Sequence, residues 1–294
     1  MNNDMGTNWP RSLVRLLLLG NILLAGCVNL QAVREFAKTS AATAEYRQIL
    51  ADYTGSPHRQ QRYQPGRLSE QLSALDKART EQKAGLERAQ TILVQYLNAL
   101  GDLASDALPH IDKEVDQLGS ALEKARFVGV GDAAIKKETA TATGTIAKIL
   151  TKVFLEHWRR PQVRRMIRET DGSLQTVIAG LREIVLQDCN ASLDVEAEVI
   201  RKYFEKSMAA ALSRNDPDGV PPLARLLMLE RLEEIEARRG RLSRYAEVLQ
   251  TIGRGHADLA RNVDRFHDMA LRERLKQYAD ELQALYRAIR EISR

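Results

Sequence analysis

Apolar residues recur at steps of three and four along most of this chain, most regularly in its last quarter. That stretch forms a seam: Leu242, Tyr245, Leu249, Ile252, His256, Leu259, Val263 and Phe266. Alternating steps of this kind predict a heptad seam on a long helix. The pattern slips near Val263 and resumes from Leu275, which predicts a local change of supercoil rather than a helix end. A helix continuous from Leu223 would be about 100 Å long.

Weaker patterns of the same period predict further helices over residues 29–53, 68–103 and 161–208, with a break at Pro109. The sequence SRNDPDGVPP, residues 213–222, is dense in turn-forming residues and predicts a hairpin between two long helices. No stretch shows convincing strand-like alternation. The expected fold class is therefore all-α, an elongated antiparallel bundle of long helices with coiled-coil-like packing.

Composition and charge agree with this fold and argue against a nucleic-acid partner. Aromatic residues make up 5% of the chain, and the net charge of +5 is spread without a block of Lys and Arg. The densest basic cluster comprises Arg159, Arg160, Arg164, Arg165 and Arg168. Arg160, Arg164 and Arg168 are four residues apart, so these three lie along one helix face if the helix continues. That face is either simply solvated or a contact for anionic lipid heads, lipopolysaccharide or an acidic partner.

The N-terminal sequence is typical of a targeting signal rather than of a bundle helix. The apolar run 16–24 follows Arg11 and Arg15 and is far shorter than the ~20 residues of a spanning helix, which is typical of a signal peptide. At its end, Leu24-Ala25-Gly26-Cys27 resembles the lipobox of bacterial lipoproteins. The resemblance implies cleavage between Gly26 and Cys27, a diacylglycerol on the Cys27 thiol, and an N-acyl chain such as palmitate. The alternative is a buried cysteine that ends an ordinary hydrophobic segment.

Anchoring and domain organisation follow from this resemblance. Each buried methylene of an acyl chain adds about 0.8 kcal/mol, so a multiply acylated cysteine is a stable membrane anchor. In many Gram-negative lipoproteins an Asp directly after the acylated cysteine signals retention in the inner membrane. Position 28 is Val here, so the resemblance implies an anchor on the periplasmic face of the outer membrane. The predicted organisation is a lipoprotein signal peptide over 1–26, a lipid-anchored N-terminal helix and turn over 27–66, and an elongated helical bundle over 67–294.

Candidate chemistry beyond the lipid is sparse. The five histidines show no metal-ligand spacing, no nucleophile motif occurs, and Gly129-x-Gly131 lacks the rest of a phosphate-binding fingerprint. Cys189 is interpreted as a buried unpaired thiol, with an intermolecular disulfide as the alternative. His256, on the seam, is interpreted as a polar register-setting residue, with a pH-sensitive interhelix contact as the alternative. We therefore expect no metal, no cofactor other than the acyl chains, and no catalytic residues.

These observations predict a structural or protein-binding helical module of the cell envelope, with an envelope protein or peptidoglycan as its partner. The alternative is a membrane-active helical protein in which residues 127–155 change conformation. Small residues at Ala140, Ala142, Gly144 and Ala147 suit either a close helix contact or such a change. A third hypothesis is a hydrolase of envelope polymers, whose carboxylates only folding would bring together.

Overall fold

The computed structural model describes residues 30–45, 47–64, 68–105, 107–111, 115, 136–158, 160–214 and 219–292. Its described residues form helices and connecting turns without a strand, which confirms the all-α prediction. After a first helix over residues 30–44, the elements are α2 (Gln48–Thr54), α3 (Ser56–Gln61), α4 (Leu68–Ala104), α6 (Lys137–Leu155), η1 (Arg160–Gln162), α7 (Val163–Glu183), η2 (Ile184–Cys189), α8 (Asn190–Leu212), α9 (Val220–Arg261) and α10 (Met269–Ile292).

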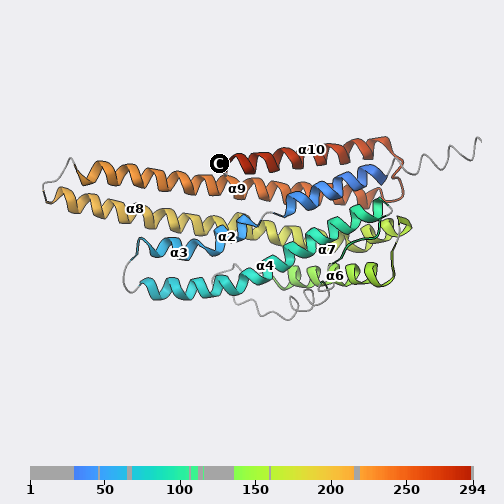
Figure 1. Cartoon of the computed structure of the whole chain (residues 1–294), viewed down its shortest axis with the longest axis horizontal. Coiled ribbons are helices and arrows are strands. Elements are labelled where there is room, and N and C mark those ends of the chain that lie inside the picture. The colour runs from blue at the N-terminus through green and yellow to red at the C-terminus, as the bar shows by residue number, and fades with distance from the viewer. Residues whose placement is uncertain are drawn as a thin grey trace, which may run out of the picture.

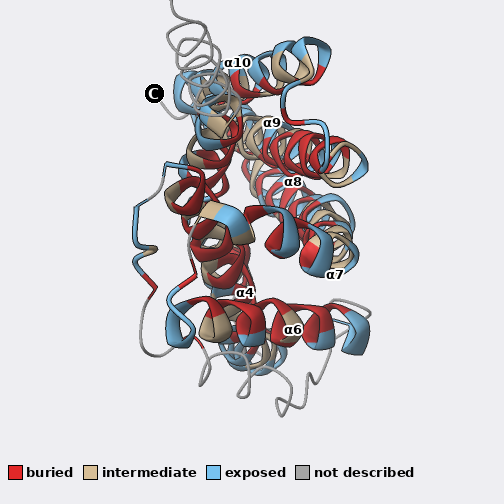
Figure 2. Ribbon diagram, turned by 90° about the vertical axis from the view of Figure 1, so that its right-hand side faces the viewer, coloured by how far each residue is buried: buried red, intermediate tan, exposed pale blue. Residues whose placement is uncertain are grey.

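Helix α9 is the central helix of an elongated bundle (Figure 1). The six-residue π-helix η2 joins α7 and α8 into one continuous rod, and this rod packs antiparallel to α9. Helix α10 folds back along the other side of α9. On the remaining side lie α2, α3 and α4, and α6 closes the bundle against α4 and α7 (Figure 2). The faces that the helices turn toward one another carry the buried residues.

The seam predicted on the last quarter of the chain is buried along its whole length, from Leu242 to Phe266. The prediction that its helix runs on without a break is wrong. Helix α9 ends at Arg261, the chain turns, and α10 begins at Met269 with the Asp268 carboxylate accepting a hydrogen bond from the backbone N–H of Ala270. The phase slip near Val263 therefore marks a turn. By its rise per residue α9 is about 63 Å long, not 100 Å.

The N-terminal region also differs from its prediction, because the helix expected over residues 29–53 is broken after Ala44. The carbonyl oxygen of Ala44 accepts hydrogen bonds from Gln90 Nε2 at 2.8 Å and from Tyr245 Oη at 3.1 Å. Side chains of α4 and α9 thus satisfy a helix-terminal carbonyl that a continuing helix would use. Residues 30–64 contribute Phe36 and Tyr53, among others, to the same core as the rest of the bundle.

Two close approaches between helices depend on small residues. The Cβ of an alanine at Gly255 would overlap the Phe36 ring, so glycine there lets the first helix approach α9. Ala140 and Ala147 are buried on α6 where it packs against α7, as expected for a close helix contact.

The segment 127–155, for which the sequence suggested a change of conformation, is described only in part, because residues 127–135 lie outside the described residues. Among those that are described, no helix combines the length and apolar character needed to cross a bilayer.

Candidate functional site

The α8–α9 hairpin projects beyond the described helices that flank it (Figure 1). Helix α10 ends beside the middle of α9, where the Ile292 side chain would lie 3.4 Å from a Cβ added at Gly240. On α8, the flanking layer reaches Tyr203, whose ring centroid is 5.4 Å from that of Tyr63, just after α3. We call the projecting part, residues 201–214 and 219–233, the hairpin tip. It has two helices where the body of the protein has several layers.

Large apolar side chains are exposed on the hairpin tip. Leu226 is 64% exposed and Leu223 is 58% exposed. The exposed set on the tip is Tyr203, Leu212, Val220, Leu223, Leu226, Leu227 and Leu229. Ala224 packs inward, so this end of α9 is apolar on nearly all sides. A helix of that character is normally covered, and a concentration of exposed apolar side chains marks an interaction surface.

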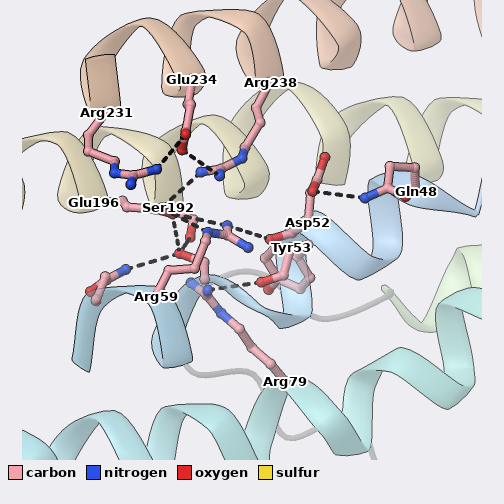
Figure 3. A network of polar contacts seen from close by, with 12 residues as sticks. Gln48, Asp52, Tyr53, Arg59, Arg79, Ser192, Glu196, Arg231, Glu234 and Arg238 are labelled. Atoms are coloured by element: carbon pink, nitrogen blue, oxygen red, sulfur yellow. Dashed lines mark hydrogen bonds and ion pairs between the residues drawn. The ribbon is translucent and has the colours of Figure 1, made fainter. Parts of the chain in front are cut away.

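A buried carboxylate anchors the base of the hairpin (Figure 3). Glu196 of α8 is 2% exposed, and Arg59 of α3 binds it through both carboxylate oxygens, at 2.8 and 3.0 Å. Arg238 of α9 donates to the same carboxylate at 2.9 Å. Ser56 of α3 donates to it at 3.2 Å. Charge-assisted and bidentate hydrogen bonds are the strong ones, so this Glu196 cluster joins α3, α8 and α9 firmly.

A second ion pair extends the Glu196 cluster to α2. Asp52 receives hydrogen bonds from Arg241 of α9 at 3.2 Å and from Gln48 at 3.2 Å. Arg59 also donates to the backbone carbonyl of Asp52, at 2.8 Å. The hairpin therefore leaves the body from a base that is fixed to α2 and α3 by charged groups.

A buried arginine and a buried cysteine lie beside this base. Arg79 of α4 lies 4.6 Å from the centroid of the Tyr53 ring and donates to the Tyr53 carbonyl oxygen at 3.2 Å. Burial raises the pKa of Tyr53 to about 12, although Arg79 opposes the shift, and it lowers the pKa of Arg79. Burial also raises the pKa of the Cys189 thiol to about 12. Cys189 is buried, as predicted, and among the described residues it has no disulfide partner. A thiol with a raised pKa is a poor nucleophile.

A separate polar network crosses the core where α4, α7 and α9 meet. The ring of His256 is fully buried, with Nδ1 2.8 Å from the Asp171 carboxylate and Nε2 2.5 Å from the Tyr96 hydroxyl. Thr170 extends this line, since its Oγ1 lies 2.7 Å from the Tyr96 hydroxyl and 2.7 Å from the Met166 carbonyl oxygen. The Asp171 carboxylate accepts a hydrogen bond from Nδ1–H, and in the neutral ring Nε2 accepts a hydrogen bond from the Tyr96 hydroxyl.

The residue types of this network resemble those of a catalytic relay, but its side chains are not accessible to solvent. Tyr96 and His256 are both 0% exposed, so neither the hydroxyl nor the imidazole meets solvent. Hydrogen bonding from His256 is the main cause that lowers the pKa of Asp171. The contacts of His256 link α9 to α4 and α7, and its role in setting the register of these helices stays a prediction.

The basic cluster predicted as an anionic contact is partly engaged within the chain. Arg168 binds both carboxylate oxygens of Asp264, at 2.7 and 2.6 Å, and Arg165 pairs with Glu169 at 2.6 Å. The Arg164 guanidinium lies 5.9 Å from the centroid of the Phe266 ring. Arg160 falls in the short helix η1 and Arg159 lies outside the described residues. An anionic ligand would compete with these internal partners, and its binding stays a prediction.

The predicted lipidation site also lies outside the described residues, which begin at residue 30, so Gly26 and Cys27 keep the status of predictions. Within the described residues, no group of three or more His, Cys, Asp or Glu side chains is placed to hold a metal ion.

Sequence reasoning missed the hairpin tip and the Glu196 cluster. The signal for the first was present in Leu223, Leu226, Leu227 and Leu229, which are too closely spaced for a single heptad seam. For the second there was none, because a glutamate among charged residues on a helix usually faces solvent. Neither a scan of protein-family models nor searches of curated proteins and of solved structures find a match to this chain.

Proposed function

We propose that this chain is an outer-membrane lipoprotein that acts as a protein-binding helical module of the periplasm. In this proposal Cys27 carries the acyl chains, the bundle is the scaffold, and the hairpin tip is the surface that binds a protein of the envelope. The exposed leucines of the tip are the observation that carries the proposal.

The positions of the two ends support this division of roles. The first described helix, which follows the proposed anchor in sequence and is blue in Figure 1, begins toward one end of the elongated bundle, and the hairpin tip lies at the other. Since α9 alone is about 63 Å long, the tip would stand well away from the lipid attachment point. The Glu196 cluster fixes the base of the hairpin, so the tip is presented in a defined direction.

A protein suits the tip better than a lipid bilayer does. The sequence joining the two helices contains Asp216 and Asp218, and insertion of the tip would carry both carboxylates toward the acyl chains. The apolar residues also extend along α9 to Leu229, as an elongated surface rather than a single apolar point. A long apolar face with charged residues beside it has the anatomy of a protein interface.

Substituting Leu223 and Leu226 together with glutamate should abolish capture of the envelope partner. The measurement is crosslinking in intact cells, followed by pull-down and comparison of the captured bands. Met269→Glu is the matched control, because Met269 is 70% exposed at the far end of the bundle. A band that the parent and Met269→Glu capture and the double variant does not would support the proposal. Equal capture by all three proteins would refute it.

Cys27→Ser should leave uncleaved precursor that carries no acyl chain. Without the thiol there is no site for the diacylglycerol, and the cleavage that depends on it does not occur. The measurement is intact mass together with membrane fractionation. A mature soluble product of the parent's size would show that the lipobox interpretation is wrong, without bearing on the hairpin tip.

A further inference from the structure

The end of the bundle opposite the hairpin tip contains the α6–α7 and α9–α10 connections (Figure 1). Side-chain contacts join the two connections. Arg168 of α7 pairs with Asp264 at 2.6 Å, and the Arg164 guanidinium lies 5.9 Å from the centroid of the Phe266 ring. We call this end the foot and define it as residues 154–158, 160–169 and 261–272.

The first helix starts at the foot, close in sequence to the proposed lipid anchor. This helix runs antiparallel to α9, since Phe36 lies against Gly255 while Tyr245 donates to the carbonyl oxygen of the last residue of the helix. Residue 30, six positions before Phe36, is therefore beside the C-terminal end of α9. Cys27 is three positions earlier still, and three residues span at most about 11 Å. An acylated Cys27 would keep the start of the first helix within that distance of the membrane interface.

The α6–α7 connection turns two large apolar side chains outward. The backbone N–H of Trp158 bonds the carbonyl oxygen five residues before it at 3.0 Å, and His157 has a left-handed backbone with φ of 49°. This is the Schellman ending of a helix, in which the residue after the left-handed position commonly packs back on the helix. Trp158 is accordingly buried, whereas Leu155 is 66% exposed and Phe154 is 45% exposed.

The foot carries more positive than negative charge. Its described residues include seven arginines and four carboxylates, which give a net charge of +3. The ion pairs among them are exposed, since the Arg168 side chain is 55% exposed and that of Asp264 is 67% exposed. Exposed ion pairs contribute little to stability, and arginine binds phosphate through paired hydrogen bonds. A phosphate group can therefore replace these carboxylates as a partner without opening the core.

We propose that the foot rests on the lipid surface of the membrane that holds Cys27, with Phe154 and Leu155 among the headgroups and the arginines of the foot on the phosphates of anionic phospholipid. The inference rests on the proposed function in taking Cys27 as the anchor. Exposed apolar side chains flanked by arginines bind such a surface through buried apolar area and attraction to anionic lipid. The bundle then stands upright, and α9 leads away from the lipid toward the hairpin tip.

The short connection to the anchor selects a bilayer rather than a protein as the occupant. A helix with its side chains is about 10–12 Å across, which is as wide as the largest gap that three residues allow between the anchor and the first helix. A folded partner protein is thicker and would not fit between the start of the first helix and the membrane. The hairpin tip has no such restriction, so the two ends of the bundle take different partners.

Fluorescence quenching tests this contact in the acylated protein, purified from membranes and reconstituted into vesicles. Leu155→Cys places a thiol-linked fluorophore on the foot. Leu226→Cys, at a residue with a closely similar exposure of 64%, places it on the hairpin tip. Burial keeps the Cys189 thiol from the label. In vesicles of phosphatidylglycerol and phosphatidylcholine with brominated acyl chains, the label on the foot should lose about half of its fluorescence and the label on the tip none. Equal quenching of the two labels, or none on the foot, would overturn the inference.

A second measurement tests the part played by the arginines. Vesicles of phosphatidylcholine alone remove the anionic headgroup, and Arg164→Gln/Arg165→Gln removes two positive charges from the foot. Each change should weaken the quenching of the foot label, because attraction to anionic lipid is lost. Arg201→Gln/Arg225→Gln, at two exposed arginines of the hairpin tip, is the matched control and should leave the quenching unchanged. Melting curves show whether the variants are folded. Quenching that neither change weakens would refute the contact with lipid phosphates.

The failure of this inference is distinguishable from that of the proposed function. Intact mass reports the acylation of Cys27, and a chain without acyl groups would overturn both the anchor and the foot. If Cys27 is acylated and the Leu155→Cys label is not quenched, the inference alone is wrong. If that label is quenched while Leu223→Glu/Leu226→Glu keeps its envelope partner, the foot stands and the proposed role of the hairpin tip is wrong. The acyl chains anchor every variant, so Met269→Glu, on the foot, remains a control for capture at the tip.

Discussion

Glu196→Ala is expected to lower the free energy of unfolding by about 3–5 kcal/mol. The substitution leaves the guanidinium groups of Arg59 and Arg238 at a largely buried site without the carboxylate that both of them bind. An uncompensated buried charge costs far more than the pair contributes relative to apolar residues. Chemical denaturation followed by circular dichroism measures the change.

Glu198→Ala is the matched control for this experiment. Glu198 is on the same helix, exposed, and paired with Lys202 at 3.0 Å. Exposed pairs of this spacing contribute about 0.3–0.5 kcal/mol, so the control should stay close to the parent. A loss of less than about 1 kcal/mol for Glu196→Ala would mean that water reaches the two arginines and that the Glu196 cluster does not fix the hairpin base.

His256→Ala has the second large expected effect, a loss of about 3 kcal/mol. Removing the ring leaves a cavity and takes one hydrogen-bond partner each from the Tyr96 hydroxyl and the Asp171 carboxylate. Tyr96→Phe should cost less, about 1–3 kcal/mol, because it removes a hydroxyl while the imidazole keeps its bond to Asp171. His58→Ala is the control at an exposed histidine and should change stability by less than about 0.5 kcal/mol.

His256→Ala should also change how the free energy of unfolding responds to acid. Hydrogen bonding from His256 lowers the pKa of Asp171, so its contribution to stability is fully present above the unfolded-state pKa of about 3.9. It is lost as the pH falls through the lower folded-state pKa. His256→Ala removes this contribution, and its loss of stability should therefore be largest above about pH 4 and shrink below it. A difference from the parent that stays constant down to about pH 2 would contradict the assignment.

Together the two buried networks explain how a long, narrow bundle holds a projecting hairpin. The His256 network ties α9 to α4 and α7 near one end, and the Glu196 cluster ties it to α3 and α8 near the base of the tip. Hydrogen bonds restrict which register the helices adopt, whereas apolar contacts alone tolerate sliding.

What the sequence determines by itself is the helical class and much of which residues lie inside. The period of the apolar residues is a property of one helix, so it correctly predicts that Leu242 through Phe266 are buried. Local chemistry also correctly places the break after α4 before Pro109 and the start of helix near Pro161. Cys189 is buried for a similar reason, since its apolar surroundings are local in the sequence.

The tertiary structure decides where helices end and which polar groups are inside. The first helix stops at Ala44 because Gln90 and Tyr245, distant in sequence, bind its carbonyl oxygen. Glu196 is buried because Arg59 and Arg238, on two other helices, bind its carboxylate. The sequence around Glu196 does not indicate these partners. The leucines of the tip are exposed because α2, α3 and α10 do not reach them. Each of these outcomes depends on the relative lengths and positions of packed helices, which periodicity within a single helix does not encode.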